Sequence, residues 1–506
     1  MHRICGDHAY PLFDTAATRR LETAAIAQWG PHTLMQRAGC AVARLAQALA
    51  PHARTIWVAC GSGNNGGDGL EAAMQLRLSG RHVVVSWLGT PHTAAQGALL
   101  SWERARDAGV VFSDLPPPDL CADDLCVDAL LGIGLSAATR PGAPDLRLQA
   151  LLQALHRTAA PVLCVDVPSG LLADTGQFAQ GLAPRAGQAR SPRHTLSVLT
   201  LHPGLFTADG RDAAGSVWFD DLGMDAGTER PCAHLFARHR PQERAQNTHK
   251  GSYGDVAVVG GEGLHARGMG MTGAALLAAS AALHAGAGRV MVSLLDDGEV
   301  TQDIAQPECM LRRFDALPLH ELTAVCGCGG GQAVRAVLPT VMAQAMRLVL
   351  DADALNAIAA DTSLQHALRS RAASGLPTVL TPHPLEAARM LGADAAAVQA
   401  DRLAAIRQLV DRFECAVVLK GSGSIVAAPG HAPRINRTGN ARLATGGTGD
   451  VLAGLVGALL ARMDSANAQM ALDAALLACE HHGQVADDWP AGRALTASAL
   501  ARRLCP

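Results

Sequence analysis

The sequence predicts an α/β protein with two domains, each built on a mostly parallel sheet that helices cover on both faces. Short apolar runs typical of buried strands alternate along the chain with segments typical of helices. At 506 residues, the chain is also too long for one ordinary hydrophobic core. We therefore expect two three-layer α/β domains that follow each other along the chain.

The first half of the chain predicts a series of parallel strands. An apolar run at Thr55–Cys60 predicts the first strand, and a glycine-rich loop and a helix over about Gly69–Ser79 follow it. The next strand is predicted at Val83–Trp87. Leu125–Asp128 and Val162–Asp166 predict two further strands, each of which ends in an aspartate. Because ligands of parallel sheets bind beyond the C-terminal ends of the strands, these ends are candidate site edges.

A second α/β pattern begins after a polar, turn-prone stretch at residues 225–245. We therefore expect a first domain over residues 1–230 and a second over residues 240–506. The strands predicted in the second domain are Asp255–Val259, Arg289–Val292, Leu348–Asp351, Pro377–Leu380 and Ala416–Leu419.

Composition and charge disfavour several classes of function. The net charge is −3 and there is no basic tract, which argues against a dedicated surface for nucleic acid or anionic membrane. No signal peptide is recognisable, and the most apolar stretches, such as residues 451–460, are too short or too interrupted by glycine to span a bilayer. The 13 cysteines are scattered, so we expect a reduced, cytoplasmic protein in which Cys326 and Cys328 fill a turn and bind no metal.

The glycine-rich segment Gly61–Gly69 carries the first candidate site. Glycines allow backbone N–H groups to approach an anion, and a helix N-terminus adds a favourable field. Asn65, Asp128 and Ser169 offer hard oxygen ligands that suit an alkali or a hard divalent cation. Asp166 is a candidate acid–base group or a ligand of a sugar hydroxyl. The alternative is that an aspartate at a strand end only caps a helix.

Lysine is rare in this chain. Of its 42 lysines and arginines, only Lys250 and Lys420 are lysines, and each directly precedes a glycine. An ammonium group is a compact point charge, whereas guanidinium is a broad planar fork. A compact cation beside glycine backbone is suited to holding phosphate, so we expect this role for Lys420. The alternative is chance retention in an arginine-rich sequence.

The segment Ala444–Asp450 carries the second candidate site, directly before a helix predicted at Val451–Arg462. Small residues and backbone amides at a helix start form an anion hole. Asp450 is expected in the first helical turn, where it suits a general base that acts on a hydroxyl beside a phosphate. The alternative is again that Asp450 only caps the helix.

The motifs of the first half resemble those of the NAD(P)H-hydrate epimerase domain over roughly residues 10–225. These are the Asn-Asn-Gly-Gly-Asp-Gly motif at 64–69, Asp-Ala-Leu-Leu-Gly at 128–132, Asp-Val-Pro-Ser-Gly-Leu-Leu-Ala-Asp-Thr-Gly at 166–176, and residues 34–39. The resemblance implies a Rossmann-like domain that interconverts the R and S epimers of hydrated NADH and NADPH. It also implies a K⁺ site at Asn65, Asp128 and Ser169, and Asp166 as the acid–base residue. The implied substrate contacts are Asn64, Asn65, Gly66, Gly67, Asp68, Gly132, Ile133, Gly134, Leu135, Ser136, Ala137, Ala138 and Asp166.

The second half resembles ribokinase-like kinases, and among these the ADP-dependent NAD(P)H-hydrate dehydratase over roughly residues 240–500. The supporting motifs are residues 249–251, 286–288, 351–356, 381–384 and Gly-Thr-Gly-Asp at 447–450. The resemblance implies that ADP phosphorylates the 6-hydroxyl of the S hydrate, with Mg²⁺ present, and that elimination then releases AMP and phosphate. Asp450 is implied as the catalytic residue. Implied substrate contacts are Ala274, Gly329, His383 and Asp450; implied ADP contacts are Lys420, Gly421, Ser422, Gly423, Ser424 and Gly449.

Four positions depart from the family patterns: Ile133 replaces a usual threonine, His202 a lysine, Cys328 a proline and Leu385 a glycine. The resemblance assigns no role to Lys250. It implies small-molecule partners, no nucleic acid or membrane partner, and a homo-oligomer. Two alternatives stay open at this point. The second domain could be an ATP-dependent small-molecule kinase with an auxiliary ligand-binding first domain, or the first domain could be a non-catalytic scaffold.

Overall fold

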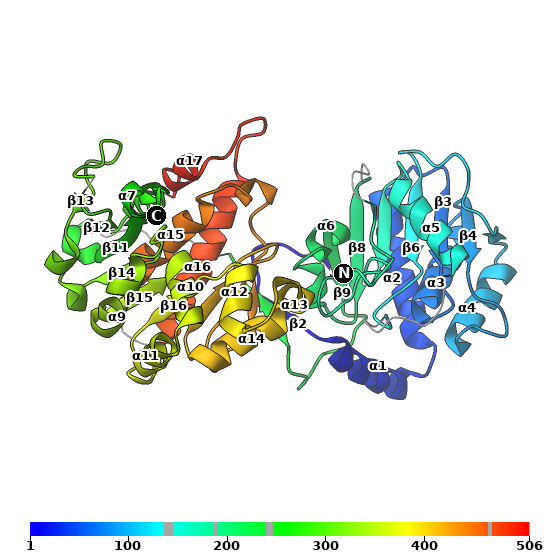
Figure 1. Ribbon diagram of the computed structural model, residues 1–506. Helices are drawn as coiled ribbons and strands as arrows, with labels where there is room; N and C mark the ends of the chain where they lie inside the picture. Colours follow the sequence, from blue (N-terminus) through cyan, green and yellow to red (C-terminus); the bar gives the residue numbers. More distant parts are fainter. Residues whose placement is uncertain (136–144, 186–190, 239–245, 299, 464–467, 505–506) are drawn as a thin grey trace. The chain divides into compact units, whose positions relative to one another are not determined.

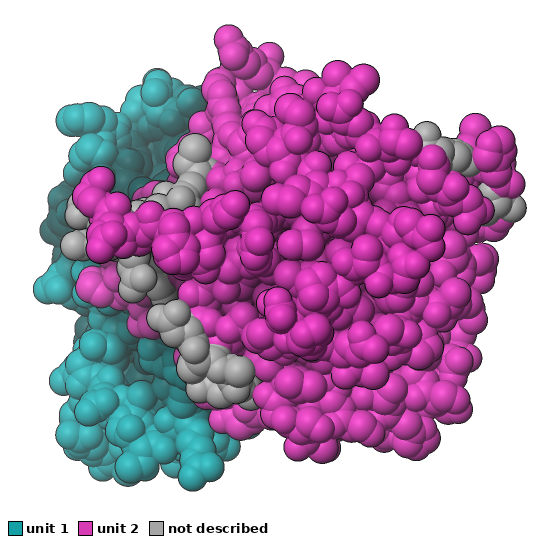
Figure 2. All heavy atoms as spheres, turned by 90° about the vertical axis from the view of Figure 1, so that its left-hand side faces the viewer, with its two compact units in different colours: residues 1–6, 10–234 teal, residues 7–9, 235–506 magenta. Residues whose placement is uncertain are grey.

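The computed structural model describes residues 1–135, 145–185, 191–238, 246–298, 300–463 and 468–504. The chain divides into two compact units, residues 1–6 with 10–234 and residues 7–9 with 235–506 (Figure 2). No helix in the described ranges is both long and apolar enough to cross a membrane. Both units are α/β, as the sequence predicts.

The first unit contains an eight-stranded sheet in the order β1-β9-β8-β7-β6-β3-β4-β5 (Figure 1). Neighbouring strands are parallel except β1, which is antiparallel to β9. The strands are β1 His2–Arg3, β3 Ile56–Cys60, β4 Val83–Trp87, β5 Val111–Phe112, β6 Leu125–Ala129, β7 Val162–Val165, β8 Arg193–Val198 and β9 Ser216–Asp220. The helices are α1 Thr15–Trp29, α2 Thr33–Leu49, α3 Asn64–Leu78, α4 Gln96–Asp107, α5 Leu146–Arg157 and α6 Gly210–Ala214. Two short strands, β2 Tyr10–Leu12 and β10 Ala233–Leu235, pair with each other.

Side chains of β3 alternate between two cores, one on each face of this sheet. Ile56, Val58 and Cys60 pack with residues of α2 and α3, whereas Trp57 and Ala59 pack with residues of α5. This alternation follows from the two-residue period of a strand. The three-layer arrangement predicted from the apolar runs is therefore present in this unit.

The topology determines where a ligand can bind in the first unit. From β3 the chain continues to β4 and β5 on one side, and it then crosses to β6, β7 and β8 on the other side. The loops that leave the C-terminal ends of β3 and β6 therefore diverge and leave a crevice, which is the usual binding place in open parallel sheets.

The second unit also has a sheet with a switch point. The strand order of this sheet includes β13-β12-β11-β14-β15-β16-β17-β18-β19. Strands β13 to β17 are parallel, and β18 and β19 are added antiparallel. The strands are β11 Asp255–Glu262, β12 Arg289–Leu295, β13 Met310–Leu311, β14 Thr323–Cys326, β15 Arg347–Leu350, β16 Thr378–Leu380, β17 Ala416–Leu419, β18 Ile425–Ala427 and β19 Arg434–Ile435. Its switch point lies between β11 and β14.

Helices cover both faces of the second sheet (Figure 1). Residues of α8, α15, α16 and α17 form one core with Val256 and Val258 of β11. On the other face, α9 contacts β14 and α14 contacts β17. The helices are α7 Leu264–Arg267, α8 Thr272–His284, α9 Val334–Gln344, α10 Ala352–Ala360, α11 Thr362–Ala373, α12 Pro384–Leu391, α13 Ala395–Ala400, α14 Arg402–Phe413, α15 Thr448–Ala461, α16 Ala468–Asp487 and α17 Ala497–Ala501.

Glycines let α15 lie very close to its neighbours. A Cβ atom added at Gly454 would lie 2.0 Å from the carbonyl oxygen of Ala278 on α8, and one added at Gly457 would lie 2.3 Å from Val325 on β14. Backbone and packed strand atoms cannot easily yield, since interiors are close-packed. The position of α15, and of Asp450 in its first turn, therefore depends on the absence of these side chains.

Gly454→Ala is expected to lower the free energy of unfolding by about 1–3 kcal/mol, because overpacking forces the backbone to shift. Gly273→Ala is the matched control, since Gly273 lies in α8 and an added Cβ would meet no atom within 4 Å. That change is expected to stabilise the helix by about 0.5–1 kcal/mol. Thermal or denaturant unfolding of the full chain measures both, and equal effects of the two changes would contradict the packing argument.

Some predicted boundaries were wrong. The helix after β3 begins at Asn64, not near Gly69, so most of the glycine-rich segment is the first turns of α3 and only Gly61–Gly63 is loop. The predicted strands match β3, β4, β6, β7, β11, β12, β15, β16 and β17 to within a few residues. Strands β1, β2, β5, β8, β9, β10, β13, β14, β18 and β19 were not predicted.

Candidate active sites

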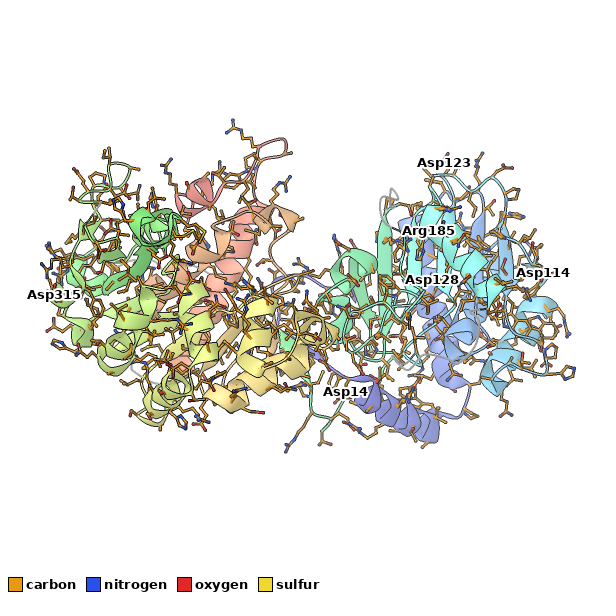
Figure 3. All side chains as sticks on the ribbon, viewed as in Figure 1. Asp14, Asp114, Asp123, Asp128, Arg185 and Asp315 are labelled. Atoms are coloured by element: carbon orange, nitrogen blue, oxygen red, sulfur yellow. The ribbon has the colours of Figure 1, made fainter. Side chains whose placement is uncertain are left out.

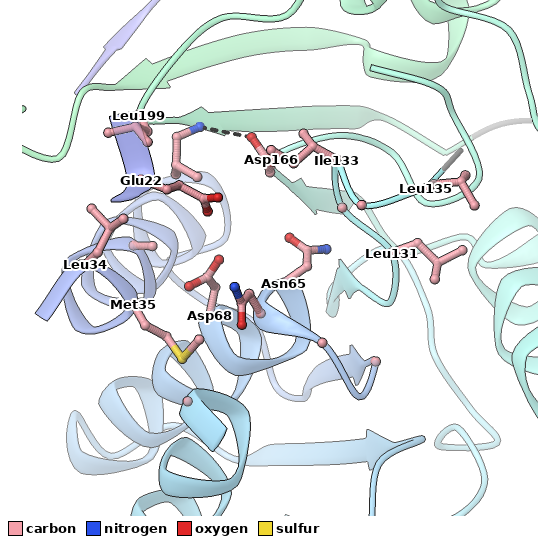
Figure 4. A pocket seen from close by; sticks show the side chains of 18 of the residues that line it. Glu22, Leu34, Met35, Asn65, Asp68, Leu131, Ile133, Leu135, Asp166 and Leu199 are labelled. Carbon is pink, nitrogen blue, oxygen red and sulfur yellow. Dashed lines mark hydrogen bonds between the residues drawn. The ribbon is translucent and has the colours of Figure 1, made fainter. Parts of the chain in front are cut away.

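A cavity of about 560 Å³ lies at the switch point of the first unit (Figure 4). The predicted contacts that line it are Asn64, Asn65, Asp68, Gly132, Ile133, Gly134, Leu135 and Asp166. Gly66 and Gly67 are buried in the first turn of α3 and are not among the lining residues. Ser136, Ala137 and Ala138 lie outside the described residues.

Asp166 directly follows β7 and lies at the cavity with 8% of its surface exposed. Its φ of 65° places it in the left-handed region, which is uncommon for a residue with a side chain and frequent at functional sites. Its Oδ1 accepts a hydrogen bond from Val198 N at 3.4 Å (Figure 4). No helix begins here, so the capping alternative does not apply to Asp166.

His202, one of the four departures from the family pattern, lies beside Asp166. Its imidazole is fully buried, and its Nδ1 lies 3.2 Å from the carbonyl oxygen of Phe13. A carbonyl only accepts, so Nδ1 carries a hydrogen, and Nε2 faces Asp166 Oδ1 at 3.6 Å. Burial lowers the pKa of His202, but the carboxylate of Asp166 outweighs burial, and the net shift is upward. Asp166 therefore raises the proton affinity of the His202 imidazole.

Two further carboxylates face the same cavity, Glu22 from α1 and Asp68 from α3 (Figure 4). Burial, reinforced by the charge of Asp166, raises the pKa of Glu22. Burial, Asp166 and Glu22 together raise the pKa of Asp68 well above its usual value. Glu22 was missed by the sequence reasoning, because a single glutamate in an ordinary amphipathic helix carries no motif.

The predicted cation ligands surround the segment that follows β6. Asp128 is buried (Figure 3), and it accepts hydrogen bonds from Ser169 N at 3.0 Å and from Ser169 Oγ at 2.5 Å. Ser169 Oγ also accepts from Leu131 N at 2.8 Å. A Cβ added at the next residue, Gly132, would lie 3.1 Å from Asn65 Cγ. Burial raises the pKa of Asp128, and no ion pair neutralises it among the described residues.

In the second unit, Asp450 lies in the first turn of α15, as predicted. The N-cap of this helix is Gly447 and has no side-chain hydrogen bond, so Asp450 does not cap the helix. One ligand atom each of Cys328, Asp351 and Asp450 lie within 4.8 Å of one another. Burial first, and the charge of Asp351 second, raise the pKa of Asp450 to about 6.

Lys420 follows β17 and joins the same cluster. Its Nζ lies 2.7 Å from Asp351 Oδ1 and 3.9 Å from Glu386 Oε2. A Cβ added at Gly449 would lie 3.4 Å from this Nζ, so the fold brings the Lys420 loop against the start of α15. Burial lowers the pKa of Lys420, but the surrounding carboxylates raise it further, so the group stays an ammonium.

His383, an implied substrate contact, caps a helix. It is the N-cap of α12, and its Nδ1 accepts from Leu385 N at 3.1 Å and from Glu386 N at 3.2 Å. Glu386 Oε2 accepts from His383 N at 2.8 Å. The ring nevertheless remains 45% exposed. Burial raises the pKa of Glu386 to about 7, which leaves it partly protonated near neutral pH.

The loop after β14 brings two predicted substrate contacts together. A Cβ added at Gly329 would lie 2.9 Å from Ala274 Cβ on α8. Cys328, expected only to fill a turn, is fully buried with its Sγ 3.9 Å from Asp351 Oδ2. Burial raises its pKa well above the usual value, so it remains a thiol. Lys250 lies elsewhere, exposed in the 3₁₀ helix η2 Lys250–Tyr253.

Both halves of the chain are similar to known proteins. A family model described as NAD(P)H-hydrate dehydratase matches residues 256–505, and one described as YjeF-related protein N-terminus matches residues 31–204. The chain is 36% identical over 471 residues to the bifunctional NAD(P)H-hydrate repair enzyme Nnr of Escherichia coli, covering 90% of this chain and 85% of the relative.

Two further relatives match about nine-tenths and about half of the chain. Identity is 33% over 480 residues to Nnr of Coxiella burnetii, covering 91% and 92% of the two chains. It is 39% over 275 residues to the ADP-dependent (S)-NAD(P)H-hydrate dehydratase of Neisseria meningitidis, covering 53% of this chain and 88% of that relative. The two family models in this order, together with relatives at this identity over most of the chain, show that the chain belongs to the family of bifunctional NAD(P)H-hydrate repair enzymes.

Proposed function

We propose that the first unit epimerises the R and S forms of hydrated NADH and NADPH, and that the second dehydrates the S form at the expense of ADP. Family membership over nine-tenths of the chain is the observation that carries this function. A stereospecific dehydratase consumes both epimers only if they interconvert, which explains why the two activities share one chain. The domain limits 1–230 and 240–506 and a homo-oligomeric state stay expectations, which limited proteolysis and light scattering test.

In the first unit, Asp166 is the proposed acid–base residue. It would donate a proton to the departing C6 hydroxyl and accept one when water returns to the opposite face of the ring, so that no atom is gained or lost overall. His202, held against Asp166, would stabilise the carboxylate that forms once Asp166 has given up its proton. Glu22 and Asp68 face the same cavity as further polar contacts for the substrate.

The residues around Asp128 fit a potassium ion. The carboxylate is buried and forms no ion pair among the described residues, and Asn65 and Ser169 would supply two more hard oxygens. A bound K⁺ would neutralise Asp128 and hold the segment after β6 in place at the edge of the cavity.

In the second unit, Asp450 is the proposed general base. It would accept the proton of the 6-hydroxyl as that oxygen attacks the β-phosphorus of ADP, with AMP as leaving group. Elimination of phosphate and loss of a ring proton would then restore the nicotinamide. Lys420, Gly421, Ser422, Gly423, Ser424 and Gly449 are the proposed ADP contacts, and Ala274, Gly329 and His383 the proposed substrate contacts.

Asp351 also fits a magnesium ion. One carboxylate that is completed by substrate phosphates is a usual Mg²⁺ environment, whereas the soft thiol of Cys328 is not a ligand that Mg²⁺ prefers. When bound, Mg²⁺ would neutralise charge on the phosphates of ADP. Lys420 already pairs with Asp351 and would reach the phosphates from the other side.

Recovery of the reduced-nicotinamide absorbance tests the whole proposal. The substrate is a mixture of R and S hydrates of NADH, supplied with ADP, Mg²⁺ and K⁺. Recovery of the full absorbance, with release of AMP and phosphate, is expected. Recovery that stops once the S epimer is spent would exclude an active epimerase unit, and a stable phosphorylated product would indicate a kinase instead.

The dehydratase rate is expected to fall as the pH drops through about 6, the pKa of Asp450, because a protonated carboxyl cannot accept the hydroxyl proton. Glu386, with a pKa of about 7, titrates nearby, so Glu386→Gln is the control variant. The acidic limb measured in kcat/KM should persist in that variant. Loss of the acidic limb in Glu386→Gln would show that Glu386, and not Asp450, causes the fall in rate.

A further inference from the structure

A buried arginine lies directly beneath the loop proposed to hold ADP. Arg402 is the first residue of α14, and only 1% of its surface is exposed. One terminal nitrogen donates to the carbonyl oxygens of Leu419 at 3.2 Å, Lys420 at 3.3 Å and Gly423 at 3.3 Å. The other donates to Gln399 Oε1 at 3.1 Å. The guanidinium therefore ties both ends of the Lys420–Ser424 loop to one point.

No carboxylate neutralises this guanidinium. Within the described part of the chain Arg402 forms no ion pair, and its Nε has no hydrogen-bond partner. Burial alone lowers its pKa to about 10, so it stays charged at neutral pH. A buried cation without a counter-ion is costly to maintain, and an anionic ligand would offset that cost.

The backbone of the loop is shaped around Arg402. Gly421 has a φ of 140° and Gly423 a φ of 64°, conformations that favour glycine. A Cβ added at Gly421 would lie 2.2 Å from a terminal nitrogen of Arg402. Three carbonyl oxygens turn inward to the guanidinium, so Arg402 fixes the course of the loop backbone.

We propose that Arg402 is a positioning residue of the nucleotide site, whose buried positive charge takes the phosphates of ADP as its counter-ion. The inference rests on the proposed placement of ADP at the Lys420–Ser424 loop. Arg402 would act in two ways. It fixes the course of the loop through three carbonyl groups, and it adds a permanent positive field that water screens only weakly at a buried position.

Arg371 provides a matched control in the same unit. It is 3% exposed, and it donates to the carbonyl oxygens of Met342 at 3.2 Å and Pro377 at 3.4 Å, and to Thr378 Oγ1 at 2.8 Å. Its pKa is likewise lowered to about 10 by burial, and it forms no ion pair among the described residues. None of its partners belongs to the proposed nucleotide site, so its chemistry matches that of Arg402 in a different place.

The test compares Arg402→Gln and Arg402→Lys with Arg371→Gln and Arg371→Lys in the full chain. Calorimetry measures the affinities for ADP, AMP and adenosine, and thermal unfolding measures stability. Arg402→Gln is expected to weaken the binding of ADP about tenfold. The binding of AMP should be weakened less and that of adenosine least, because the lost interaction scales with ligand charge. Arg402→Lys retains the positive charge, so its affinity for ADP should fall less. The Arg371 variants should lower stability and leave all three affinities unchanged.

Two results would overturn the proposal. One is an equal loss of affinity for adenosine and for ADP in Arg402→Gln, which would show that the role of Arg402 is purely structural. The other is an equal change in ADP affinity for the Arg371 and Arg402 variants. If Arg402→Gln does not fold, the neutral variant Arg402→Met decides, and a ratio of ADP to adenosine affinity equal to that of Arg371→Met refutes the inference. Unchanged ADP affinity in Lys420→Ala would instead show that ADP binds elsewhere, and so reject the proposed site itself.

Discussion

Asp450→Asn is expected to lower dehydratase turnover by about 10²–10⁴-fold, the usual contribution of a general base. The asparagine keeps the size of the side chain in the first turn of α15 but cannot accept the hydroxyl proton. Since Asp450 does not cap this helix, the fold should be unaffected. Turnover is measured on the purified S hydrate, together with ADP affinity and the thermal unfolding temperature.

The same chain contains the control for Asp450→Asn. Epimerisation by the first unit should proceed at the wild-type rate, and ADP should still bind. Asp315→Asn changes an exposed carboxylate of the second unit (Figure 3) and should leave turnover unchanged. If Asp450→Asn instead abolished ADP binding or lowered stability markedly, the residue would have a structural role and the proposed base would have to be sought elsewhere.

Asp166→Asn is expected to slow epimerisation by about 10²–10⁴-fold, for the same reason. The change is well suited to its position, because asparagine tolerates the left-handed backbone conformation that Asp166 adopts at φ 65°. Loss of activity can therefore be assigned to the proton and not to the backbone. The rate of exchange between the R and S hydrates, followed by chromatography, measures the effect.

Dehydration of the pure S hydrate should be unchanged in Asp166→Asn, since that reaction needs only the second unit. Asp114→Asn alters a highly exposed carboxylate of the first unit (Figure 3) and should not change epimerisation. A wild-type epimerisation rate in Asp166→Asn would show that Asp166 is not the acid–base residue. Glu22 and Asp68, which face the same cavity, would then be the next candidates.

Most of the strands and helix starts that carry both sites could be predicted from the sequence, because each is recognisable from a short stretch of residues. Buried strands that end in Asp128 or Asp166, and a glycine-rich helix start before Asp450, are visible within a few residues. The parallel topology then brings these ends to one edge of each sheet. The helix start at Asn64 was misplaced because glycines, usually unfavourable in helices, are required here for close packing: a Cβ at Gly66 would lie 2.0 Å from Gly61 O.

The remaining parts depend on contacts between residues far apart in the chain, for which no local signal exists. Lys420 pairs with Asp351 across 69 positions, and Glu22 reaches the first cavity from a helix near the N-terminus. His202 was visible only as a departure from a family pattern, and the structure shows that this departure falls beside Asp166. Strand β8 was missed because polar residues open it, although its later residues are buried.

The close approach of α15 to α8 and β14 has a consequence for saturation mutagenesis. Gly454 and Gly457 touch no proposed ligand, yet any side chain there would displace the helix that carries Asp450. When variants are scored by activity alone, these two glycines should appear as intolerant as the reacting carboxylates. The activity of each variant therefore has to be compared with its protein abundance. Without that comparison, residues that are needed only for packing would be taken for catalytic residues.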